Sequence, residues 1–276
     1  MTHHTNFASS KLTVWWREFA SYEPRFFMTG LLVWLAMLPT FVVALMDTRT
    51  INGVSVWDKP LKFQFAFGLY LLTLVVYARF LPDDVRYRNW YRRLSIAVAL
   101  SALAEVVWTA GAGAIGTESH FNSSLIGLAI YTVMGIAAIV IVSASSVYAF
   151  QIARNKRLTL SPAIIRSLIL GLAMTAPLTL VTAGTIMDGH WVGGSNTDES
   201  GLLLLGWVRD GGDLRVAHFF ATHALHFVPA FGLISSTVLG KEKTWPVTAF
   251  ATLFLAFTLW TLFQAHAGLP FLPSIG

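Results

Sequence analysis

The chain has 276 residues, of which 55% are apolar and 12% are charged, whereas a soluble domain carries about 25% charged residues. This composition indicates an integral membrane protein, so the net charge of +5 reflects membrane topology rather than nucleic-acid binding. The chain has no cysteine, which excludes disulfides, thiolate nucleophiles and Cys-ligated metal centres; a metal ion would have to bind His, Asp or Glu.

Apolar runs of about 20 residues recur along the chain and predict seven transmembrane helices. The predicted spans are 26–46, 61–80, 94–114, 123–148, 163–186, 214–239 and 246–266. Residues 1–25 are expected to form a cytoplasmic interfacial segment, because the stretch KLTVWWREFASYEP mixes large apolar side chains with charges. Residues 26–266 then form a single transmembrane domain, followed by a short extracytoplasmic tail at 267–276.

The distribution of basic residues predicts the orientation in the membrane. With a cytoplasmic N-terminus, most of the 19 Lys and Arg fall in cytoplasmic segments, as the positive-inside rule requires. The C-terminus is then extracytoplasmic, because the number of spans is odd. We therefore expect an all-α, seven-transmembrane-helix bundle in the lipid bilayer of a bacterial inner membrane.

The connection between the fifth and sixth predicted spans, residues 187–213, is a long outer loop. It contains an apolar island from Leu202 to Trp207 that is too short to cross a membrane. So long a loop in a small bundle is usually functional or folded back on the protein. We expect the island to cap the bundle or to dip into the outer interface.

The stretch GGDLRVAHFFATHALHFVPAFG, residues 211–232, contains three of the eight histidines. At about 100° per residue, Arg215, His218, Thr222 and His226 share one stripe of the sixth predicted helix, and His223 stands on the shoulder of that stripe. Polar groups in hydrocarbon must face protein or water. The stripe is therefore expected to line one wall of an outward-facing polar pocket.

Spacing limits how these histidines can bind a metal ion. His218 and His226 are separated by about 12 Å of helix rise, too far to share one ion, whereas His223 and His226 could chelate one. Haem b with two His ligands needs one imidazole from each of two facing helices. For haem, we expect the ligand that faces the sixth span to be His120 or His266. For a metal ion, the candidate ligands are His218, His223, His226 and His266.

Glu105 in the third span lies at nearly the same depth as His226, roughly 14 Å below the outer boundary. An ionisable residue inside the membrane is by default a functional candidate with a named partner. We therefore predict that Glu105 and His226 pair as a catalytic or proton-carrying site. The alternative is that Glu105 is neutral, or is bonded to a neighbouring hydroxyl, and only holds helices together.

The segment RDGGDLR, residues 209–215, has two interpretations. Asp213 is well placed to cap the sixth helix. Alternatively, Asp213 and the outer cations belong to a clamp for an anion or a lipid headgroup, built from Arg209, Arg215, Lys59 and Lys62.

The strings SHFN at 119–122 and GDLRVAHF at 212–219 resemble a group of uncharacterised bacterial polytopic membrane proteins, a resemblance that implies no activity. Seven-helix zinc hydrolases, such as alkaline ceramidases and adiponectin receptors, also combine Ser, Asp and His inside the membrane. The present chain departs from them, because its last span has no His-x-x-x-His and ends at the single His266.

The preferred interpretation is a membrane redox protein that binds haem b or a His-ligated divalent metal and exchanges electrons with a quinone or a periplasmic partner. One alternative is a proton-coupled transporter with Glu105 and His226 at the midplane, although the sequence shows no repeated halves and no interrupted helix pair. The others are a zinc-dependent lipid hydrolase and a non-catalytic subunit of a membrane complex.

Overall fold

The computed structural model describes residues 16–120, 124–199 and 201–273. Its main helices are α2 (Pro24–Met46), α3 (Asp58–Ala78), α4 (Asp83–Arg86), α5 (Asn89–Ile115), α6 (Leu125–Arg154), α7 (Pro162–Thr185), α8 (Leu214–Thr222), α9 (Ala224–Val238) and α10 (Trp245–His266). Two antiparallel pairs of short strands join them, β1 (Thr50–Ile51) with β2 (Val54–Ser55) and β3 (Trp191–Val192) with β4 (Gly212–Asp213). Residues 16–22 are also helical.

Six of the helices, α2, α3, α5, α6, α7 and α10, are each long and apolar enough to cross a membrane. They confirm six of the predicted spans, with boundaries that differ by a few residues. The remaining predicted span, 214–239, is not one continuous helix: α8 and α9 meet there at an angle of 54° and reach membrane length only together. The chain is therefore a multi-pass helical membrane bundle with one broken helix.

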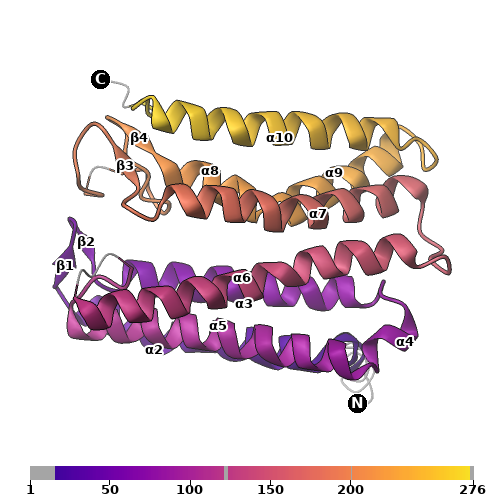
Figure 1. The fold of residues 1–276 in the computed structure, drawn as a ribbon, viewed down its shortest axis with the longest axis horizontal. Helices are drawn as coiled ribbons and strands as arrows, with labels where there is room; N and C mark the ends of the chain where they lie inside the picture. The colour runs from indigo at the N-terminus through magenta and orange to yellow at the C-terminus, as the bar shows by residue number, and fades with distance from the viewer. Residues whose placement is uncertain (1–15, 121–123, 200, 274–276) are drawn as a thin grey trace, which may run out of the picture.

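The bundle has two layers, with α2, α3, α5 and α6 in one and α7, α8, α9 and α10 in the other (Figure 1). Helices α6 and α7 pack against each other and link the layers. All four strands lie at one end, which we call the strand end, while α4 and the start of α2 lie at the opposite end (Figure 1). We call the latter the basic end, because the helix termini there carry most of the Lys and Arg residues.

The N-terminal interfacial segment can be followed only in part, because residues 1–15 are outside the described ranges. In the described part, the rings of Trp16 and Phe19 pack on Phe27 of α2. The segment thus contacts the basic end of the bundle.

A continuous apolar core runs through the first layer and reaches α7 and α9 of the second. Phe26, Leu71, Tyr148, Leu172 and Leu225 are almost completely buried and belong to the same cluster. Large apolar side chains on the outer faces are instead exposed. This arrangement suits a surface that faces lipid rather than water.

The long loop folds back on the strand end, as expected from the sequence. Trp207 and Val208 are buried, and the Trp207 ring packs edge-on against Phe219 and Phe271. Strand β3 pairs with β4, which leads directly into α8. The loop therefore fixes the start of the broken helix.

Candidate functional site: a histidine pair at a helix break

The break between α8 and α9 occurs at His223, in the middle of the bundle (Figure 1). Pro229, in the second turn of α9, has no N–H to donate to the carbonyl of Leu225, and its ring crowds that carbonyl. The hydroxyl of Tyr77 on α3 donates to the Leu225 oxygen instead, at 2.8 Å. Tyr77 therefore pairs the carbonyl that Pro229 leaves without a donor, in the first turn of α9 directly after the break.

Close packing against α7 holds the break in place. A Cβ atom on Gly171 would lie 2.7 Å from Cδ of Pro229 and 2.9 Å from the oxygen of Ala224. Only glycine permits α7 to approach so near. The bend is therefore built into the packing of the second layer.

The break brings together the imidazoles of His223 and His226. Their Nδ1 atoms are 3.0 Å apart, and Nε2 of His226 lies 2.9 Å from the hydroxyl oxygen of Thr73 on α3. The hydroxyl of Thr73 in turn donates to the carbonyl of Leu69, at 2.7 Å. This chain of contacts connects the two layers of the bundle.

One arrangement of protons satisfies all three contacts. Because the Thr73 proton is used on Leu69, the Thr73 oxygen must accept from Nε2–H of His226. Neutral His226 then has a bare Nδ1, which accepts from Nδ1–H of His223. His223 is left with a bare Nε2, and this nitrogen is the position at which the pair can take up a further proton.

His218 lies on α8, between this pair and the strand end. Its Nδ1 is 3.1 Å from the hydroxyl oxygen of Thr182 on α7. The Thr182 proton goes to the carbonyl of Leu178, so Nδ1 of His218 is the donor and its Nε2 is bare.

The predicted pairing of Glu105 with His226 is not formed among the described residues. Both nitrogens of His226 are occupied by His223 and Thr73, and the charged group that acts on Glu105 is Lys59. The prediction treated 214–239 as a straight helix. The break directs His226 toward α3 instead of α5.

The expected haem and metal ligands are dispersed. His266 is exposed on the last turn of α10, His218 contacts Thr182, and His120 contacts Lys59 and Ser119. Across the described ranges, no three His, Asp or Glu side chains form a group that could hold a metal ion. His223 and His226 are adjacent, as their spacing predicted, but without a third ligand of these types.

Asp213 caps α8, as one of the two interpretations of RDGGDLR predicted. Its Oδ1 accepts from the backbone N–H of Arg215, at 3.0 Å, and its carboxylate also binds the Arg215 guanidinium. The same guanidinium binds both oxygens of Asp198 in the long loop, at 2.9 and 2.7 Å. Arg215 therefore ties the loop to the start of the broken helix.

Asp198 remains ionised at this position. Burial alone would raise its pKa, but the imidazole of His190 at 3.6 Å and the hydrogen bonds from Arg215 outweigh burial and hold the pKa below the usual range of an aspartate. The indole N–H of Trp191 also donates to its Oδ1, at 3.1 Å.

The other cations of the proposed clamp have separate partners. Lys62 binds Asp58 at 2.6 Å and the carbonyl of Leu205 in the loop at 3.2 Å. Arg209 donates to the carbonyl of Pro273, and Lys59 lies beside His120. Lys62 and Arg215 thus fasten the loop, rather than joining Arg209 and Lys59 in a shared anion site.

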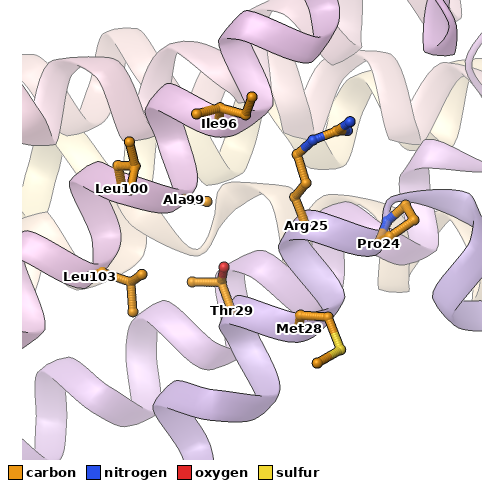
Figure 2. Close-up of a pocket in the computed structure, with 8 residues that line it drawn as sticks. All are labelled: Pro24, Arg25, Met28, Thr29, Ile96, Ala99, Leu100 and Leu103. Carbon is orange, nitrogen blue, oxygen red and sulfur yellow. The ribbon is translucent and has the colours of Figure 1, made fainter.

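A groove of about 450 Å³ lies away from the histidines, between α2 and α5 at the basic end (Figure 2). Its walls are mainly apolar, from residues such as Met28, Leu100 and Leu103. The one charged side chain at its edge, Arg25, binds Glu23 and Ser95. The groove therefore has no group suited to proton transfer.

Several site residues were not identified from the sequence. Thr73 and Thr182 are single hydroxyls in apolar helices, where threonine usually bonds its own backbone, and Asp198 is one of many polar residues in the loop. The polar stripe of 211–232 indicated the site from the sequence. It gave no indication of the partners on α3 and α7.

Comparison with known proteins gives no match, whether with family models, curated proteins or solved structures. The resemblance carried by the strings SHFN and GDLRVAHF stays an expectation. The geometry of the site is therefore the basis for assigning a function.

Proposed function

We propose that the protein is a proton-coupled membrane transporter whose proton-binding centre is the pair His223 and His226. The observation that carries this proposal is the contact of 3.0 Å between the two Nδ1 atoms at a break in a membrane helix. Interrupted helices with polar groups at the break are a recurring feature of ion and substrate sites in transporters.

The proton step needs no other reactant. A proton that binds the bare Nε2 of His223 makes that ring an imidazolium. Its Nδ1 proton can then pass across the 3.0 Å contact to Nδ1 of His226, which leaves His223 neutral and His226 positively charged. One N–H bond breaks and one forms, so the charge moves from the break toward α3.

Helix dipoles favour His223 as the first proton acceptor. His223 is at the C-terminal end of α8, where the partial negative charge stabilises a cation and partly offsets the opposing charge at the start of α9. His226 is in the first turn of α9, where the partial positive charge opposes one. A proton on His226 is thus the higher-energy state, from which release is favoured.

The membrane setting follows the same proposal. The basic end faces the cytoplasm of a bacterial inner membrane, because Lys and Arg are retained on that side. The strand end, with its docked loop, then faces outward, and His218 lies between the outer surface and the pair.

Redox chemistry with haem b, a metal or a quinone, and zinc-dependent hydrolysis, lack comparable support. They require a set of converging ligands, whereas His120, His218, His223 and His226 engage lysine, threonine or each other. An absorption spectrum and a metal analysis of purified protein separate these chemistries from transport, since a Soret band indicates haem.

The test is proton movement into proteoliposomes under an imposed membrane potential, with and without a panel of small organic acids and amines. Wild-type protein is expected to move protons, and His226→Gln and His223→Gln are expected to reduce the flux at least about tenfold. The matched variant His266→Gln replaces an exposed histidine and should retain the flux. If His266 bound haem instead, the same variant would lose activity. Flux that is absent under every condition, or that survives both variants of the pair, overturns the proposal.

A further inference from the structure

Glu105 of α5 is a buried carboxyl group outside the histidine centre. Its side chain belongs to a residue that is 2% exposed, and its Oε2 atom is sealed from solvent without a hydrogen-bond partner. An ionised carboxylate with an unsatisfied oxygen is costly in such surroundings. A protonated carboxyl avoids the cost of the charge.

Lys59, in the first turn of α3, is the cation that acts on Glu105. Its ammonium group lies 3.1 Å from Nδ1 of His120 and 5.8 Å from the centroid of the Phe63 ring. Burial, and to a lesser degree the charge of Lys59, lowers the pKa of His120 to about 3. His120 is therefore neutral at physiological pH and can accept from the ammonium group.

The charged groups on the other elements packed against α5 are engaged elsewhere. On α3, Asp58 and Lys62 bind each other, and at the basic end Arg25, in the first turn of α2, binds Glu23. The ion pairs of α4 and the segment after it are Arg86 with Asp83 and Arg88 with Asp84.

On α6, Tyr131 packs against the ring of His120, and Tyr148 bonds Tyr91 of α5 itself. Around Lys59, the further charges that act on it are Glu118, Arg215 and Asp198.

We propose that Glu105 is a second proton-binding site of the protein, which holds a proton in its buried position and whose release of that proton is favoured by the positive charge of Lys59. In the release step the O–H bond of the Glu105 carboxyl breaks, and the proton passes to solvent. Lys59 keeps all three of its protons, and its positive charge stabilises the carboxylate that remains. This site does not depend on the transport proposed for the histidine pair.

The test is infrared spectroscopy of the protein in lipid vesicles, titrated from about pH 4 to about pH 9. A carbonyl band of a protonated carboxyl is expected to titrate in the wild type and to be missing in Glu105→Gln. Lys59→Met is expected to move the midpoint upward by at least about one pH unit, a tenfold tighter binding of the proton, because it removes the positive charge.

Lys62→Met is the matched control, since it removes a cation one turn along the same helix that is paired with Asp58. It should leave the midpoint in place. If Glu105→Gln does not fold, Glu105→Asp retains a carboxyl and should shift the frequency of the band. A spectrum without a Glu105-dependent band, or a midpoint that Lys59→Met does not move, overturns the proposal. Because the readout is an equilibrium titration, it can fail or succeed independently of proton flux.

Discussion

The Nδ1 atoms of His223 and His226 lie 3.0 Å apart, so the two imidazoles share one proton between them. The contact to Thr73 makes the pair asymmetric, because the Thr73 hydroxyl already donates to Leu69. A neutral pair should therefore have one defined tautomer at each position, rather than a mixture. This asymmetry can be measured directly.

Nitrogen NMR of histidine-labelled protein at neutral pH is expected to show His223 protonated at Nδ1 and His226 protonated at Nε2. Thr73→Val removes the acceptor of His226, so the His226 proton should move to Nδ1 and the His223 proton to Nε2, which reverses the hydrogen bond between the rings. If Nε2–H of His226 instead stays in place without a partner, the variant should lose about 1–3 kcal/mol in stability. Thr182→Val alters the contact of His218 and should leave the pair unchanged. An Nε2 tautomer at His223 in the wild type would contradict the assignment.

Pro229→Ala is expected to straighten the broken helix. Alanine restores an N–H that can bond the Leu225 carbonyl and compete with Tyr77. From the rise of a helix, removal of the 54° bend lengthens the distance across α8 and α9 by about 4 Å. Because the chain has no cysteine, spin labels introduced at the exposed positions 210 and 237 can report this distance without background labelling.

Pro177→Ala provides the control for that measurement. Pro177 lies inside α7, which remains one continuous helix, so its replacement should leave the labelled distance unchanged. The same variants can be compared for proton flux. If the helix lengthens and the proton flux is undiminished, the bend is not required for the proposed function.

Most of the fold could be predicted from the sequence because transmembrane helices are set by the length of apolar runs. The break at His223 could not, since the apolar pattern continues through it and Pro229 lies six residues further along. Pro39 and Pro177 occupy similar positions in α2 and α7 without breaking those helices. The outcome depends on tertiary contacts, here the hydroxyl of Tyr77 and the close approach of Gly171.

The candidate site was predicted only in part, because it too depends on tertiary contacts. The wheel placed His226 on a polar stripe, which is correct, but depth alone chose Glu105 as its partner. Two groups at equal depth in a bundle need not face each other, because depth leaves the rotation of each helix undetermined. Thr73 faces His226 from another layer of the bundle, and a lone threonine gave no signal of it.

Docking of the long loop should be insensitive to pH between about 8 and about 5. The pKa of Asp198 is lowered in the folded protein, so the stability it contributes is present above the ordinary range of an aspartate. It is lost only as the pH falls through the lower, folded-state pKa. Hydrogen exchange of the loop amides across this range is the measurement.

Asp198→Asn should release the loop at every pH. Arg215 loses its two-point partner, and breaking such a partly buried pair costs about 3 kcal/mol. Faster exchange is then expected around Trp191 and in the loop. Asp188→Asn removes a carboxylate from the same loop and should have little effect. Exchange that accelerates in the wild type already near pH 6 would show that another group controls docking.

Zinc added to the protein should block the histidine pair. A tetrahedral zinc ion with Zn–N bonds of about 2.0–2.1 Å holds two nitrogens about 3.3 Å apart, close to the 3.0 Å between the two Nδ1 atoms. The ion would replace the shared proton, so inhibition of flux should weaken as the pH falls. With two histidine ligands the binding should be reversible by a chelator.

His226→Asn should lose most of the affinity for zinc, whereas His266→Asn should keep it. These variants are tested by zinc binding, because the proton flux of His226→Asn is expected to be low. Zinc that binds both variants equally would place the ion elsewhere and remove this support for a shared proton between His223 and His226.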